Sequence, residues 1–191
     1  MTNKQSKYRS YIKFLFLGLF IIFLFFADQY TKYLAVRNLS GRKEISFISG
    51  LISFSYVENR GMAWGMLSGK IVFFIVLTGL LIAFIAYSIC RIEKLTVLMP
   101  QKTGLYTFLQ FCLSILIAGA FGNLADRIKN GYVVDFIKTD FIDFPVFNVA
   151  DCYVTISMVL LIIIVLFFIK EDDLNQIFSF KKLEKGFAEE V

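Results

Sequence analysis

The sequence contains no histidine, and only 18% of its 191 residues are charged. The absence of histidine excludes Ser-His-Asp and Cys-His catalytic sites and the HExxH zinc motif. Any chemistry must therefore use carboxylates, lysine, tyrosine, hydroxyls or thiols. We expect no cofactor and no metal, because no other spacing of metal ligands is present.

Proline and cysteine are scarce as well. Two prolines exclude a proline-rich linker. Cys90, Cys112 and Cys152 are odd in number, far apart, and lie in or beside apolar runs. This pattern argues against a disulfide framework or a zinc site and favours buried thiols that act as small apolar residues.

Hydrophobic residues make up 58% of the chain, more than the half typical of soluble domains. The length allows one domain, residues 1–191. The formal net charge is +5, but the basic residues are scattered and form no stripe. We therefore expect membrane lipids as partners, and not nucleic acid.

Four stretches are long and apolar enough to cross a bilayer as helices, which needs about 20 residues. They cover residues about 14–36, 71–92, 104–126 and 149–169. The sequence thus predicts an all-α integral membrane protein with four transmembrane helices. Residues 45–57 and 132–137 are rich in β-branched and aromatic residues, which predicts short strands. Residues 61–69 are apolar with glycine at every fourth position, which favours an interfacial, partly helical flap.

The first span resembles a secretory signal, but Phe25 occupies a position where a cleavage site needs a small residue, two before Ala27. We therefore expect a retained helix. Basic residues precede it, and the first helix usually sets the orientation, although the count over all loops is nearly even. We expect both termini to be cytoplasmic, with residues 170–191 as a charged, solvated, loosely ordered cytoplasmic tail.

Polar residues at membrane depth are costly and need a reason. Asp28 and Lys32 fit an i,i+4 pair at the interface. Asn123 and Arg127 share a helical face near small residues, so a structural role and a functional role are about equally supported. Asn148 and Asp151 fit the N-cap box of the fourth span.

Asp135 has no comparable structural explanation. It interrupts a strand-like apolar run, in which burial would raise the pKa of its carboxyl group. Asp135 and Asp151 form a pair of carboxylates at the outer ends of adjacent segments. Two acids that share a proton and activate water are the aspartic-protease solution to amide hydrolysis.

Five short blocks carry a resemblance to a known family. They are residues 28–32 (DQYTK), 58–61 (ENRG), 122–127 (GNLADR), 131–136 (GYVVDF) and 147–151 (FNVAD). In this order, on a four-span protein, they resemble the signature blocks of bacterial lipoprotein signal peptidase, or signal peptidase II. The resemblance covers residues from about 14 to 169.

The resemblance implies an aspartic endopeptidase that removes the signal peptide from diacylglyceryl-modified prolipoproteins, immediately before the lipidated cysteine. It implies Asp135 and Asp151 as the catalytic pair. It also implies supporting roles for Asp28, Lys32, Asn59, Gly122, Asn123, Asp126, Arg127 and Asn148.

The family also implies a small extracytoplasmic β-cradle, an interfacial helix, sensitivity to lipopeptide antibiotics, and a location in the bacterial cytoplasmic (inner) membrane with the active site at its outer face. Met62 and Trp64 depart mildly from the family pattern, and the tail after Lys170 matches none of its motifs.

Three other functions stay open at this stage. A proton-coupled transporter or channel would also use intramembrane carboxylates. A membrane scaffold would need neither acid. A serine–lysine peptidase built on Ser68 and Lys70 is disfavoured, because residues two apart do not face each other on a helix.

Overall fold

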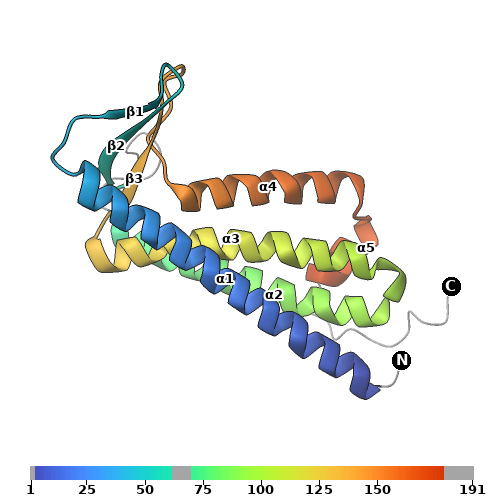
Figure 1. Ribbon diagram of the computed structural model, residues 1–191. Coiled ribbons are helices and arrows are strands. Elements are labelled where there is room, and N and C mark those ends of the chain that lie inside the picture. Colours follow the sequence, from blue (N-terminus) through green and yellow to red (C-terminus); the bar gives the residue numbers. More distant parts are fainter. Residues whose placement is uncertain (1–2, 62–69, 179–191) are drawn as a thin grey trace.

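The computed structural model describes residues 3–61 and 70–178, and it contains four long helices (Figure 1). They are α1 (Asn3–Leu39), α2 (Ile71–Leu98), α3 (Thr103–Asn130) and α4 (Val149–Phe167). All four are long and apolar enough to cross a membrane, which confirms the four predicted spans. The helices α1 and α2 extend beyond the predicted ranges, because helical structure continues into the polar residues that flank each apolar core.

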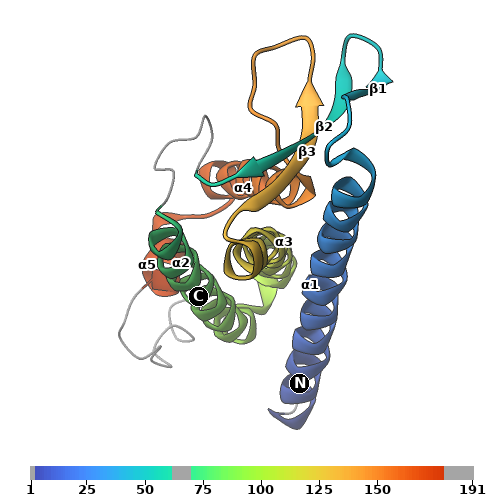
Figure 2. The ribbon, with the colours of Figure 1, turned by 90° about the vertical axis from the view of Figure 1, so that its left-hand side faces the viewer.

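Helix α3 lies at the centre of the bundle. It packs against α1, α2 and α4, and it is the most buried of the four (Figure 2). The other three expose most of their apolar side chains outward, as helices facing lipid do. The central helix is therefore the one that can hold polar side chains away from lipid.

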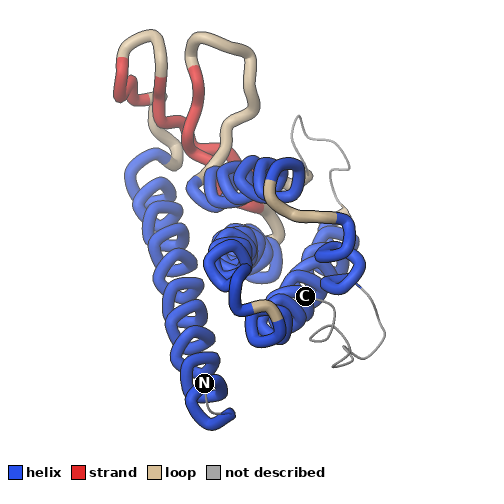
Figure 3. Tube along the Cα trace, turned by 90° about the vertical axis from the view of Figure 1, so that its right-hand side faces the viewer, coloured by secondary structure: helices blue, strands red, loops and turns tan. Residues whose placement is uncertain are grey.

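A three-stranded antiparallel sheet lies at one end of the bundle (Figure 3). It consists of β1 (Ile45–Ile48), β2 (Ile52–Asn59) and β3 (Val133–Thr139), in the order β1-β2-β3. The turn between β1 and β2 contains Gly50 at φ 72°, a backbone conformation that glycine adopts without strain. The sheet confirms the predicted strands.

The sheet packs against the end of α1 through one of its faces. Val134 and Phe136 of β3 contact Ala35 and Leu39 of α1 in a small hydrophobic core. Because side chains alternate along a strand, Asp135 between them points to the opposite face. This alternation directs the carboxylate toward α3 and α4.

The expectation of a solvated, loosely ordered tail is wrong for residues 171–178. They form helix α5 (Glu171–Phe178), which packs against α2. It also contacts the 3-10 turn η2 (Pro100–Lys102) that follows α2. Asp173 is buried and accepts hydrogen bonds from Lys102 Nζ (2.7 and 2.8 Å) and Tyr106 (2.7 Å). A carboxylate with these partners, together with buried Ile177, holds the segment against the bundle. Residues 179–191 lie outside the described residues, as do residues 62–69 of the predicted flap.

The expectation that the three cysteines are buried thiols is confirmed only in part. All three are free, and Cys112 is buried while Cys152 is half-buried. Cys90 is exposed on the outward face of α2, where an apolar thiol can face lipid.

Candidate active site

Asp135 is the buried carboxylate of the sheet, with 2% of its surface exposed. Its Oδ1 accepts a hydrogen bond from Asn148 Nδ2 at 2.6 Å, and its Oδ2 accepts one from Asn59 Nδ2 at 2.9 Å. Asn59 is the last residue of β2, which pairs with β3. Both oxygens therefore have amide donors from fixed elements.

Asp151 lies in the first turn of α4. Asn148 caps this helix: its Oδ1 accepts from the Asp151 N–H at 3.1 Å, and its own N–H donates to Asp151 Oδ2 at 3.1 Å. The other oxygen, Oδ1, accepts from Asn123 Nδ2 at 2.7 Å. These contacts confirm the predicted capping box, and they leave Asp151 half-buried.

Asn148 connects the two carboxylates. Its side-chain amide donates to Asp135, and its backbone N–H donates to Asp151. One residue, itself fully buried, thus fixes an oxygen of each acid. The structure therefore brings together two acids that are 16 positions apart in the sequence.

The environment of Asp135 makes its carboxyl group easier to protonate than that of an ordinary aspartate. Burial raises the pKa of the Asp135 carboxyl group to about 6, from an ordinary value of 3.8. The hydrogen bonds from Asn59 and Asn148 lower this pKa, while the charge of Asp151 raises it further. A buried acid beside a second acid is the arrangement in which two carboxyl groups share a proton.

A buried ionic cluster supports the pair. Lys32 Nζ lies 3.0 Å from Asp28 Oδ2 and 3.1 Å from Asp126 Oδ2, and it donates to Asn123 Oδ1 at 3.0 Å. The contact with Asp28 confirms the predicted i,i+4 pair, and with 3% and 0% of their surfaces exposed Lys32 and Asp28 form it inside the protein. The i,i+4 spacing predicts the contact between Lys32 and Asp28, but it does not indicate the second carboxylate, Asp126 of α3.

The same carboxylates hold the elements that carry the acids. Asp28 Oδ1 accepts from the Ala150 N–H at 2.9 Å, which joins α1 to the first turn of α4. Asp126 Oδ2 accepts from the Val134 N–H at 3.1 Å, which joins α3 to β3. Ala150 precedes Asp151 and Val134 precedes Asp135 in the sequence. The cluster therefore fixes the backbone N–H of the residue just before each acid.

Gln29 also belongs to this cluster, although no prediction from the sequence included it. Its Nε2 donates to Asp28 Oδ2 (3.2 Å), Asp126 Oδ1 (3.1 Å) and the Gly122 carbonyl (3.3 Å). Its position beside Asp28, at the end of an otherwise apolar span, was the available signal.

Gly122 allows α3 to lie close to this cluster. A Cβ at this position would lie 2.4 Å from Asp28 Oδ2 and 3.2 Å from the Ala150 side chain. One turn earlier, a Cβ on Gly119 would lie 2.6 Å from the Ala150 carbonyl oxygen. The small residues predicted to permit close helix contact do so here.

Arg127 connects the site to the start of the predicted flap. Its guanidinium donates to the Gly61 carbonyl at 3.2 Å and lies over the Phe74 ring, 5.1 Å from its centroid. The Gly61 N–H donates to Asn59 Oδ1 at 3.0 Å. Arg127 thus holds residue 61, where the chain leaves the site. Among the described residues, its hydrogen bonds go to the Gly61 and Asn123 carbonyls and not to either acid.

All ten residues selected from the sequence therefore lie at the sheet end of the bundle, in one connected set. The fold and this set of residues define a multi-pass membrane protein with a pair of acids at one end of its helices.

Comparison with known proteins identifies the family. Residues 20–167 match the family model described as Signal peptidase (SPase) II. Proteins named lipoprotein signal peptidase include one from Caldanaerobacter subterraneus, 41% identical over 74% of this chain and 89% of its own, and one from Enterococcus faecalis, 38% identical over 71% and 78%. The chain belongs to the signal peptidase II family, and it is a peptidase of the membrane.

Solved structures agree with this assignment. A bacterial membrane enzyme determined by the in meso method is similar with a TM-score of 0.65 at 32% identity, over 88% of this chain and 94% of its own. A second gives a TM-score of 0.64 at 36% identity, over 81% and 94%. The family match ends at residue 167, so α5 lies beyond it.

Proposed function

We propose that this protein is an aspartic endopeptidase that removes the signal peptide from diacylglyceryl-modified prolipoproteins, with Asp135 and Asp151 as its catalytic pair. The bond cut is the one immediately before the lipidated cysteine. The observation that carries the proposal is the position of Asn148, which donates to an oxygen of each acid. The relatives named lipoprotein signal peptidase support the choice of substrate.

We assign Asp135 as the protonated partner, because burial raises its pKa to about 6 and makes it easier to protonate than an ordinary aspartate. In this mechanism the Asp151 carboxylate takes a proton from water, and the resulting hydroxide attacks the peptide carbonyl carbon. Asp135 donates its proton to the carbonyl oxygen, which gives a neutral tetrahedral diol. Asp151 then returns the proton to the leaving nitrogen as the C–N bond breaks, and the diol returns a proton to Asp135.

The remaining residues have supporting roles in this proposal. Asn59, Asn123 and Asn148 hold the carboxylates, while Asp28, Lys32 and Asp126 hold the backbone around them. Such preorganisation fixes the reacting groups before substrate arrives. Compounds that place a hydroxyl group between the acids, as lipopeptide antibiotics would, should bind as mimics of the diol.

The location follows from the substrate. An exported prolipoprotein carries its cysteine at the outer face of the membrane, because its signal helix inserts with the basic end inside. We therefore place the acids at the outer face of the bacterial cytoplasmic membrane and both termini in the cytoplasm.

The test is cleavage of a diacylglyceryl-modified prolipoprotein by the purified full-length protein. We expect Asp135→Asn and Asp151→Asn each to lower kcat by about 1,000-fold or more, since neither variant can complete the proton cycle. The matched control is Asp143→Asn, an exposed acid on the loop that joins β3 to α4. Each variant should keep its helical circular dichroism spectrum.

Full activity in either Asp→Asn variant would remove that residue from the catalytic role. Equal cleavage of the same prolipoprotein without its lipid would instead refute the proposed substrate, while leaving the acid pair intact.

A further inference from the structure

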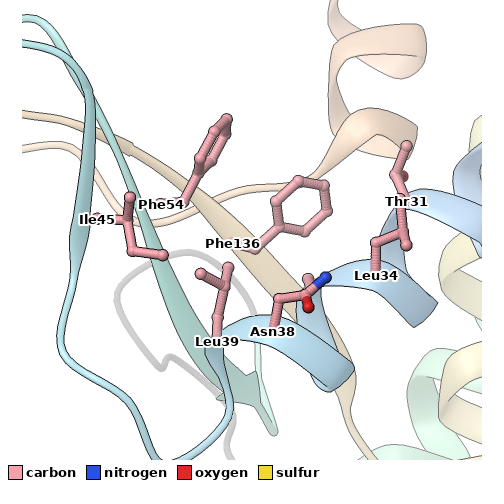
Figure 4. Close-up of a pocket in the computed structure, with 8 residues that line it drawn as sticks. Thr31, Leu34, Asn38, Leu39, Ile45, Phe54 and Phe136 are labelled. Carbon is pink, nitrogen blue, oxygen red and sulfur yellow. The ribbon is translucent and has the colours of Figure 1, made fainter.

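A cavity outside the catalytic site lies between the end of α1 and the sheet (Figure 4). Its volume is about 320 Å³, within the range of small-molecule sites. Leu34 and Leu39 of α1 line one side, and Phe54 and Phe136 of the sheet line the other, so the walls are almost entirely carbon. A cavity of this kind is suited to a hydrocarbon chain.

The cavity is separate from the pair of acids. Phe136 lines the cavity and follows Asp135 in β3, so the two side chains point to opposite faces of the strand. On α1, Thr31 lines the cavity, whereas Lys32 points into the buried ionic cluster. A chain attached to a peptide at the acids would have to pass around β3 to reach the cavity. This separation disfavours the lipid of the substrate as its occupant.

The cavity lies at the level where the membrane surface is expected. Tyr30 and Tyr33 of α1 are 62% and 55% exposed, and they flank the lining residue Thr31 in the sequence. Exposed tyrosines of this kind mark the boundary between hydrocarbon and headgroups. The cavity extends from Thr31 to Leu39 and Ile45, which lie at its end farther from the apolar part of α1. The polar end of a lipid chain would lie at this end of the cavity.

Positive charge is present at the end of the cavity that Leu39 and Ile45 line. Arg42 and Lys43 lie on the loop that connects the lining residues Leu39 and Ile45, and both are exposed. No carboxylate among residues 3–61 and 70–178 forms an ion pair with either of them. The neighbouring Glu44 is paired with Lys138 at 2.7 Å. Among the described residues, the loop therefore offers two cations without an ion-pair partner, near the end of the cavity where a lipid phosphate would lie.

We propose that this cavity binds one acyl chain of an anionic glycerophospholipid, whose phosphate contacts Arg42 and Lys43. The lipid fills the space between α1 and the sheet and so supports the position of β3. This site is independent of the catalytic pair, and it can exist whether or not the proposed peptidase activity is correct.

The test measures lipid binding to the purified, delipidated full-length protein by native mass spectrometry and thermal denaturation. Phosphatidylglycerol should be retained and should raise the midpoint of unfolding, whereas phosphatidylcholine with the same chains should have a clearly smaller effect. Glycerol phosphate, which lacks the chains, should have none. The double variant Arg42→Gln/Lys43→Gln should bind phosphatidylglycerol about tenfold more weakly.

A second variant fills the cavity. Leu34→Trp should reduce retention of phosphatidylglycerol, and its matched control is Leu19→Trp, which places the same side chain on the exposed face of α1. The charge control is Lys129→Gln, an exposed cation at the same end of the molecule. If Leu34→Trp does not fold, the exposed charge pair still tests the site.

Equal binding of phosphatidylglycerol and phosphatidylcholine would overturn the proposal, as would unchanged binding in the charge variant. Displacement of phosphatidylglycerol by a diacylglyceryl-modified peptide would identify the substrate as the occupant, and dimers that appear on delipidation would identify a second copy. Either result would also overturn it.

Discussion

At the scale of single residues, Asn148 performs two tasks: it caps α4 and donates to both acids. We predict that Asn148→Ala lowers kcat by about 10- to 100-fold, because Asp135 loses a fixed donor and the first turn of α4, which carries Asp151, loses its cap. The lost cap should lower the free energy of unfolding by only about 1 kcal/mol. The control is Asn130→Ala, at an exposed position at the end of α3.

Separate measurement of kcat and KM, with thermal denaturation in micelles, distinguishes positioning from folding. A kcat no lower than that of Asn130→Ala would contradict the positioning role of Asn148.

Asp135 predicts a pH dependence of stability. Its pKa is raised from 3.8 to about 6 in the folded protein, so the folded state binds more protons than the unfolded state between these values. Stability should therefore fall as the pH rises from about 4 to about 6, with a cost of up to about 3 kcal/mol above pH 6. Asp135→Asn, which stays neutral, should lose this dependence.

The measurement is the unfolding midpoint of both proteins from pH 4 to pH 8. The advantage of Asp135→Asn over wild type should grow with pH and level off above about pH 6. A constant difference across this range would show that the pKa of Asp135 is not raised in the folded protein.

At the scale of elements, the contact between α3 and α4 depends on Gly119. A Cβ there would lie 2.6 Å from the Ala150 carbonyl oxygen and 2.9 Å from the Val154 side chain. We predict that Gly119→Ala costs about 1–3 kcal/mol of stability, because α4 must move away. Gly79→Ala in α2 is the control, since nothing lies within 4 Å of a Cβ there.

Gly79→Ala should be neutral or slightly stabilising, because alanine favours helix over glycine. Melting temperatures and peptidase rates of the two variants provide the comparison. Equal stability would mean that α3 and α4 do not pack as closely as described.

Elements with local signals could be predicted from the sequence, and contacts between distant segments could not. The four spans follow from apolar length, and the N-cap box of Asn148 and Asp151 follows from their spacing. The second partner of Lys32, Asp126, lies on another helix, and no periodicity indicates it. The packing of α5 depends likewise on the distant Lys102, which the charged composition of the tail did not reveal.

At the scale of the whole molecule, the acid pair and the sheet lie at one end of the bundle, and α5 lies at the other (Figure 1). With four spans, the first and last helices place the N-terminus and α5 on the same side of the membrane. The basic residues before the first apolar stretch favour the cytoplasm for that side. On this basis we expect the sheet end to face outward, where an exported substrate would carry its cleavage site.

Labelling with a membrane-impermeant thiol reagent tests this orientation. In a background without Cys90, Cys112 and Cys152, we predict that Lys129→Cys, in the last turn of α3, reacts in intact cells. Lys94→Cys should react only after permeabilisation, because it lies toward the opposite end of the bundle on α2. Both positions are exposed, so different labelling reflects sidedness and not burial. The reverse pattern would place the acids in the cytoplasm, away from any exported prolipoprotein, and the proposed peptidase activity would fail with it.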